Sequence, residues 1–214
     1  MPIDIYIDTS SPPCHAVLMT ADHLGIKYNK KRIDIHAGEQ FKGEFLKINP
    51  QHTVPTLDDG GFYLAESRAI QTYLANAYGP DNPIYPKNPK ERGVVDRMLY
   101  FDIGTLFEAE KGYLAPLFRD VPDDPKKLEQ LQDALELLEG FLSLTPYVAG
   151  GHITLADFSI FAHITFVEIV ADYPFAVFPK ISNWIERMKA EVPSYSSIEK
   201  TLVDLKECVK KPNK

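Results

Sequence analysis

Apolar and polar residues follow two different periods in the first eighty residues. The segment IDIYI (3–7) alternates between them and is rich in β-forming residues, which predicts a strand. NKKRIDI predicts a second strand. Between them, apolar residues recur at the spacing of one helix face, at Val17, Leu18, Ala21 and Leu24. Gly25 is expected to end that helix.

The same unit continues with two more helices around a hairpin. GEQFKGEFLKIN predicts a short helix that ends at Asn49-Pro50. TVPTLDD and FYLA form a hairpin-like pair joined by DGG. ESRAIQTYLANAYG then predicts a helix with one apolar face, made of Ile70, Tyr73, Leu74 and Ala77. The order β-α-β-α-β-β-α indicates an α/β unit with a mixed sheet.

The pattern changes after the proline-rich stretch GPDNPIYPKNP, and everything beyond it is predicted to be helical. Residues 155–170 are apolar almost all round, which predicts the buried central helix of a second domain. TLAD before it is a capping box in which Asp157 serves the helix end, although a functional Asp157 remains an alternative. Two further helices show a single apolar face, at Leu128, Leu131, Leu135, Leu138 and Leu142, and at Ile181, Trp184, Ile185 and Met188.

These patterns predict an α/β domain over 1–80, a linker over 81–90 and an all-α domain over 91–214. The net charge of −7 and the lack of a basic, aromatic-rich run argue against nucleic-acid binding. The short basic end KECVKKPNK is interpreted as solvated. Two distant cysteines, no leader-like N-terminus and no long apolar run favour a soluble, reduced, cytoplasmic protein without a membrane segment.

The stretch SSPPC, just after the first predicted strand, raises the first question of chemistry. Thioredoxin-like domains carry C-x-x-C at this place, and here Ser11 stands where the first, attacking cysteine would be. Cys14 lies about one turn inside the helix and is expected to be packed, although a reactive thiol is an alternative. Ser11 could donate its hydroxyl to an anion at the helix N-terminus, or it could serve only as the N-cap.

Two later clusters carry polar groups at the ends of predicted elements. In NPQHTVPTL, a cis Val54-Pro55 bond would leave the Val54 backbone free to pair with an extended ligand, but the sequence leaves the isomer open. In ESRA, Glu66 and Ser67 suit a helix N-terminus simply as capping residues. Alternatively, Ser67 and the backbone would hold a carboxylate, Glu66 would hold an ammonium group, and Arg68 would add positive charge.

Together these clusters resemble the cytosolic glutathione transferases of the serine type, and among them the arthropod delta and epsilon classes, with the delta class favoured. The resemblance also includes LYFDIGTLF and YVAGGHITLADFSI and covers nearly the whole chain. It implies a thioredoxin-like N-terminal domain, an all-helical C-terminal domain, a homodimer and reduced glutathione as co-substrate. The implied reaction is conjugation of glutathione to small apolar electrophiles in detoxification, with insecticides among the candidates.

The resemblance also implies roles for individual residues. Ser11 would hydrogen-bond the glutathione sulfur, and Val54 would pair with the cysteinyl backbone beside Thr53 and cis-Pro55. His52 and Gln40 would face the glycyl end, where Gln40 replaces a histidine common in the family. Glu66 and Ser67 would hold the γ-glutamyl group, with Arg68 helping there or at a dimer interface, and Asp102 supporting it. The electrophile would lie between the domains, against Pro13, Ile35, Phe107, Lys111, Tyr113 and Phe118.

Several departures leave alternatives open. Ser10 is a second hydroxyl beside Ser11, and Ile7 stands where tyrosine-type relatives carry their tyrosine. Glu108, Glu110 and Lys111 are interpreted as ordinary helix-surface charges, or else they make the cleft polar. No cysteine and histidine spacing predicts a metal site. The other functions considered are a non-catalytic protein that binds apolar ligands, a thiol-disulfide exchanger using Cys14, and an isomerase of a dicarboxylic metabolite.

Overall fold

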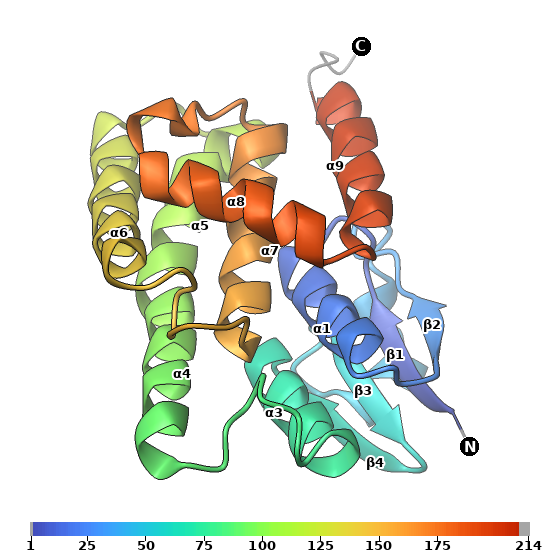
Figure 1. Ribbon diagram of the computed structural model, residues 1–214. Helices are drawn as coiled ribbons and strands as arrows, with labels where there is room; N and C mark the ends of the chain where they lie inside the picture. The colour runs from blue at the N-terminus through green and yellow to red at the C-terminus, as the bar shows by residue number, and fades with distance from the viewer. Residues whose placement is uncertain (1, 210–214) are drawn as a thin grey trace.

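The first unit is built on a four-stranded mixed sheet in the computed structural model, which describes residues 2–209 (Figure 1). Its strands are β1 (Ile3–Ile7), β2 (Tyr28–Arg32), β3 (Thr56–Asp59) and β4 (Phe62–Ala65), in the order β2-β1-β3-β4. β1 runs parallel to β2 and antiparallel to β3, and β3 and β4 form the predicted hairpin. The parallel pair requires a crossover, which α1 supplies.

Alternation in β1 decides which side chains enter the core. Ile3, Ile5 and Ile7 are buried on one face, while Tyr6 points to the opposite face and packs edge-on against Phe45. The hairpin turn passes through Gly60 and Gly61, both with positive φ, a conformation that costs glycine little. Ile7 and Tyr6 thus lie on opposite faces of the sheet.

Helix α1 (Pro12–His23) is the structural link between the two units. It packs against α3 (Ser67–Tyr78) on one side and against α7 (Leu155–Val170) of the second unit on another, so residues 14–21 are buried all round. The helix ends as predicted, with Gly25 at φ 66° and its N–H donating to the carbonyl of Asp22. The short 3-10 helix η1 (Glu39–Phe41) and α2 (Gly43–Ile48) complete this unit.

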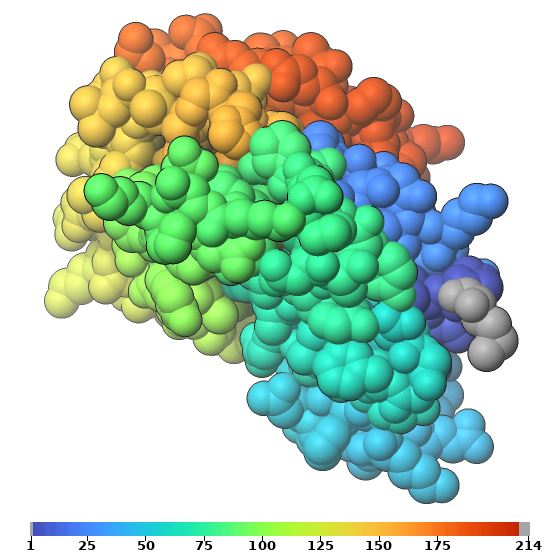
Figure 2. All heavy atoms as spheres, turned by 60° about the horizontal axis from the view of Figure 1, so that its bottom comes forward, coloured from blue at the N-terminus to red at the C-terminus, as the bar shows by residue number. Residues whose placement is uncertain are grey.

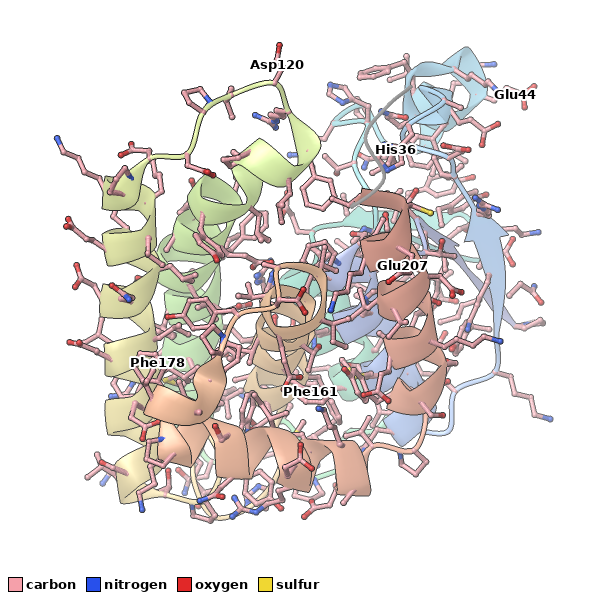
Figure 3. The ribbon with its side chains drawn as sticks, turned by 90° about the horizontal axis from the view of Figure 1, so that it is seen from above. His36, Glu44, Asp120, Phe161, Phe178 and Glu207 are labelled. Carbon is pink, nitrogen blue, oxygen red and sulfur yellow. The ribbon has the colours of Figure 1, made fainter. Side chains whose placement is uncertain are left out.

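The second unit is a bundle of helices around α7 (Figure 1). Its other elements are α4 (Pro89–Phe101), the π-helix η2 (Asp102–Leu106), α5 (Phe107–Phe118), α6 (Pro125–Leu144), the 3-10 helix η3 (Phe175–Val177), α8 (Pro179–Glu191) and α9 (Tyr195–Val209). Phe161, labelled in Figure 3, lies on α7 in the interior and is fully buried. The prediction of a buried central helix is confirmed.

The capping box before α7 is also confirmed. Asp157 accepts hydrogen bonds from the backbone and side chain of Thr154, from the Val148 backbone and from the Trp184 indole. Burial raises the pKa of Asp157 to about 6, although these four donors act in the opposite direction. Asp157 therefore stabilises the fold of the helical unit, and none of these contacts supports the alternative of a functional role.

The main corrections concern single positions in otherwise correct elements. Ala77 is exposed, and Gln71 and Ala75 are buried in α3 instead, because α3 packs against both the sheet and the second unit. Leu128 lies at the exposed start of α6. The second strand covers 28–32 rather than the full NKKRIDI, and α4 begins at Pro89 inside the predicted linker. The end of the basic tail, 210–214, lies outside the described residues.

Candidate active site

Ser11 lies at the N-terminus of α1 with its hydroxyl next to the Cys14 thiol. It occupies the N-cap position in an extended conformation, but its side chain makes no capping hydrogen bond. Pro12 and Pro13 follow in the first turn, so two backbone donors that an anion could have used are absent. A ligand at this helix end would therefore have to rely on the Ser11 hydroxyl and the helix dipole.

Ser10 is committed to a local interaction instead. Its backbone N–H and its hydroxyl both donate to Oδ1 of Asp8, at 2.8 and 2.5 Å. Asp8 is buried at the end of β1, and its other oxygen accepts a long hydrogen bond from the Ile35 backbone. This arrangement separates the two neighbouring serines, because Ser10 holds the turn together while Ser11 remains available.

Cys14 is a buried thiol. It is fully enclosed, and burial raises its pKa to about 12 although the Ser11 hydroxyl and the Asp8 backbone favour the thiolate. A thiol with so high a pKa holds almost no thiolate at neutral pH, and the thiolate is the reactive form. The prediction that Cys14 is packed is confirmed, and the burial argues against a thiol-disulfide exchanger.

The segment before β3 contains a cis Val54-Pro55 peptide bond. His52 has a positive φ of 47°, is exposed and stacks against the ring of Phe41. Thr53 is exposed as well, and its carbonyl is fixed by Asn49 and Thr56. Gln40 donates to the carbonyl of Ile35, while its own side-chain oxygen is buried without a hydrogen-bond partner among the described residues.

Glu66 and Ser67 begin α3 with an unusual backbone. Glu66 is exposed at the N-cap position with φ 71°, a conformation rare for a residue other than glycine or asparagine. Its side chain does not cap the helix, so the simple capping interpretation is wrong for Glu66. Such local strain often accompanies a functional site. Ser67 is buried beside it and accepts a hydrogen bond from Nη1 of Arg68.

Arg68 joins this helix end to a buried acid of the second unit. Its Nε and Nη2 both donate to Oδ2 of Asp102, at 2.9 and 2.5 Å. Asp102 is fully buried and also accepts from the hydroxyl of Ser159 on α7. Asp102 itself is inaccessible, but it contacts Arg68, whose side chain is 13 % exposed. The sequence analysis did not identify Ser159.

A second buried acid, Glu110 of α5, continues this cluster. Its Oε2 lies 2.6 Å from Nδ1 of His163 on α7, and Nε2 of the same ring lies 3.2 Å from Nη2 of Arg68 and 3.9 Å from Oδ1 of Asp102. Glu110 is only 3 % exposed, so its interpretation as a helix-surface charge is wrong. Glu108 and Lys111, by contrast, are an exposed pair at 3.5 Å, as expected of surface charges.

Burial opposes the charge of His163, but Glu110 and Asp102 outweigh that effect and raise the pKa of the ring. Burial also raises the pKa of Glu110, against the influence of His163.

The pKa of His15, a neighbour of His163 on α1, shifts in the opposite direction. Its Nε2 contacts the Thr9 carbonyl at 2.8 Å, and burial lowers its pKa to about 4. His15 is therefore neutral at physiological pH, whereas the two neighbouring acids favour the protonated form of His163.

The expected electrophile residues divide between two cavities. Phe107, Lys111 and Phe118 line a small cavity of about 190 Å³ together with Pro12, Glu110 and Phe166. Tyr113 instead faces a separate cavity between α5 and the start of α6, and its ring meets that of Tyr173 edge-on. Pro13 and Ile35 are half-buried nearby in the first unit but do not line the small cavity. Figure 3 shows His36, after β2, and Asp120, after α5, on the same edge of the molecule.

A separate hollow lies between α3 and α4. Figure 2 shows these two helices, in teal and green, meeting on one face of the molecule. The hollow has a volume of about 490 Å³ and includes Glu66, Arg68, Asp96, Tyr100 and Ile103 in its lining. Tyr100 is 76 % exposed there, and on β4 the rings of Phe62 and Tyr63 are exposed as well. A large exposed apolar side chain at a hollow, such as Tyr100, is typical of a protein contact surface.

Within residues 2–209, no cluster of histidine, cysteine, aspartate or glutamate has the arrangement of a metal site. Over the same range, no helix is both long enough and apolar enough to cross a membrane. The groups that the structure brings to this site are a serine hydroxyl at a helix N-terminus, an exposed strained glutamate and a buried arginine–carboxylate cluster.

Comparisons with known proteins agree on one family. Residues 1–76 match the model of the glutathione S-transferase N-terminal domain, and residues 104–187 match that of its C-terminal domain. A delta-class glutathione transferase of Nilaparvata lugens is 43 % identical, with 98 % of this chain and 99 % of that chain covered and a TM-score of 0.93. An epsilon-class enzyme of the housefly Musca domestica is 34 % identical, with 97 % and 98 % covered and a TM-score of 0.88. A homolog from Drosophila mojavensis, solved with bound glutathione, is 34 % identical, with 98 % and 96 % covered and a TM-score of 0.87.

Proposed function

Because this chain belongs to the glutathione S-transferase family and is a glutathione transferase, we propose that Ser11 activates the thiol of its co-substrate glutathione. The thiolate then attacks a small apolar electrophile. The observation that carries this proposal is the hydroxyl of Ser11 at the N-terminus of α1, which makes no capping hydrogen bond, next to a Ser10 that is bound to Asp8.

The energy required is within reach of these groups. A free thiol has a pKa of about 8.5, and lowering it by about 2 units requires about 2.7 kcal/mol of preferential binding to the thiolate. A hydrogen bond from a hydroxyl to an anion contributes about 1.5–3 kcal/mol, and a helix N-terminus contributes about 0.3–1 kcal/mol. Ser11 and the end of α1 are therefore sufficient without a metal ion.

The rest of glutathione is assigned to the surrounding segments. In this proposal the Val54 backbone, beside Thr53 and Pro55, pairs with the cysteinyl unit, and His52 and Gln40 face the glycyl end. Glu66 and Ser67 hold the γ-glutamyl group at the start of α3. Arg68 supports Glu66 and Ser67, and Asp102 holds the Arg68 guanidinium by accepting two hydrogen bonds from it.

We assign the electrophile to the small cavity beside Pro12, where Phe107, Lys111 and Phe118 meet. Its aromatic walls suit apolar electrophiles, and detoxification, including that of insecticides, is the proposed duty. Tyr113 is not part of this assignment because it faces another cavity. The free states of Cys14 and Cys208 support action in the reducing cytoplasm.

A homodimer is part of the proposal. The exposed Tyr100 and Ile103 at the hollow between α3 and α4 offer an apolar surface for a second copy. Sedimentation at micromolar concentration tests this assignment directly. A species of about twice the 24.2 kDa chain mass supports it, and a monomer contradicts it.

The central experiment is the initial rate of glutathione conjugation to chlorodinitrobenzene. Turnover above the uncatalysed background supports the proposed reaction. If calorimetry shows glutathione or apolar dyes binding while conjugation stays at background with this and a panel of smaller electrophiles, the catalytic proposal is wrong. That result would favour the non-catalytic ligand-binding alternative.

A further inference from the structure

The cluster around Arg68 contains two buried carboxylates, from Asp102 and Glu110, but only one permanent positive charge. Asp102 is entirely inaccessible and Glu110 is nearly so. Burying an unbalanced charge is strongly unfavourable, so a second positive charge is needed. His163 is the group placed to provide it, because its Nδ1 lies 2.6 Å from Oε2 of Glu110 and its Nε2, next to Nη2 of Arg68, lies 3.9 Å from Oδ1 of Asp102.

The order of the charges supports this assignment. Glu110 pairs with His163 and Asp102 pairs with Arg68, so the cluster holds two negative and two positive charges when His163 is protonated. These two contacts are the shortest, at 2.6 Å and 2.5 Å, and Nε2 of His163 joins the pairs at 3.2 Å from Nη2 of Arg68 and 3.9 Å from Oδ1 of Asp102. The groups around the ring come from four elements: His15 of α1, Arg68 of α3, Asp102 of η2 and Glu110 of α5. Of these, His15 is neutral.

We propose that Glu110 and His163 are a positioning pair that keeps the charge around Arg68 balanced and thereby holds its guanidinium in the orientation that serves glutathione. The proposal rests on the function assigned above, in which Arg68 supports the γ-glutamyl group. Glu110 also lines the small cavity beside Pro12, which we assigned to the electrophile. The pair therefore connects that cavity to Arg68, which serves glutathione. Neither residue has to touch glutathione for this role.

Charge balance makes a specific prediction for three variants. His163→Gln leaves Glu110 as an unpaired buried carboxylate and gives the cluster a net negative charge, which opposes the binding of anionic glutathione. Glu110→Gln removes one negative charge, and His163 can then release its proton, so the cluster remains neutral. The double variant is neutral as well. The single His163→Gln change should therefore be more harmful than the double change.

The measurement is the dissociation constant of glutathione by titration calorimetry, at about pH 6 and about pH 8. For His163→Gln we expect about a tenfold weaker affinity at the higher pH, and a smaller defect at the lower pH, where Glu110 takes up a proton. Glu110→Gln and the double variant should stay within about threefold of the wild type at both pH values. Glu108→Gln, which removes an exposed charge from the same helix, is the matched control and should bind like the wild type.

Two outcomes would overturn the proposal. If the double variant binds glutathione as weakly as His163→Gln, the pair contributes packing rather than charge balance. If His163→Gln binds normally at both pH values, the pair does not act on Arg68. Because binding is measured without turnover, a wild type that binds glutathione but fails to conjugate it would contradict only the catalytic proposal.

Discussion

The hydroxyl of Ser10 donates a 2.5 Å hydrogen bond to Asp8, whereas the hydroxyl of its neighbour Ser11 makes no capping hydrogen bond to the helix that it precedes. Two adjacent residues of the same type thus have different roles. The difference arises from the turn after β1, because Asp8 also accepts the backbone N–H of Ser10 and so orients that residue. In the sequence alone, only the spacing to Cys14 favours Ser11 over Ser10.

The first prediction separates these serines. Ser11→Ala should lower the rate of glutathione conjugation by about tenfold to a hundredfold, the equivalent of one hydrogen bond to an anion. The apparent pKa of bound glutathione should rise at the same time, visible as an alkaline shift of the pH–rate profile. Cys14→Ala is the matched control and should remain active because that thiol is buried. Full activity in Ser11→Ala, or an equal loss in Ser10→Ala, would contradict the assignment.

The second prediction concerns the ion pair between Arg68 and Asp102. Asp102→Asn should weaken glutathione binding by about tenfold or more and lower the free energy of unfolding by about 3–5 kcal/mol, since it leaves a buried guanidinium unpaired. Calorimetry and urea denaturation measure the two effects. Asp81→Asn breaks the exposed pair with Lys87 and should change stability by less than about 1 kcal/mol. Similar losses in the two variants would show that burial is not the decisive factor.

The fold was predictable because each element has a clear period or end signal. The alternating β1, the glycine after α1 and the apolar α7 specify their own structures, and the order of strands and helices then restricts the sheet. Errors occurred where a helix packs on two sides. In α3, Ala75 is buried and Ala77 exposed, since the sheet and the second unit cover overlapping faces of the helix.

The buried cluster could be predicted only in part. Arg68 and Asp102 are 34 residues apart, and nothing local in the sequence shows that they meet. Glu110 has the appearance of a surface charge between Glu108 and Lys111. A usable signal did exist on α7, where Ser159 and His163 are four residues apart and lie on one face of a helix that is apolar almost all round. Polar residues on a fully buried helix require partners, which indicates a buried polar cluster.

The third prediction tests Asp157 as a structural acid. Asp157→Ala removes the acceptor of four hydrogen bonds, including those from the Val148 backbone and the Trp184 indole. The free energy of unfolding should fall by about 3 kcal/mol or more, while the affinity of the remaining folded protein for glutathione stays unchanged. Asp124→Ala, at the exposed N-cap of α6, is the comparison and should cost about 1 kcal/mol. Lost glutathione affinity in folded Asp157→Ala would restore a functional role for this acid.

The last prediction is a pH dependence of stability caused by His15. Burial lowers its pKa from 6.5 to about 4, so between these values the unfolded chain binds a proton that the folded protein does not. The contribution of His15 is therefore complete above pH 6.5 and is lost as the pH falls toward 4, by roughly 3 kcal/mol in total. His15→Gln keeps a donor for the Thr9 carbonyl but has no proton to gain. Urea denaturation of both proteins from about pH 7.5 to about pH 4.5 isolates the effect, because all other groups titrate in both. The stability advantage of the wild type should shrink as the pH falls, and a difference that is constant with pH would mean that the pKa of His15 is the same in the folded and unfolded protein.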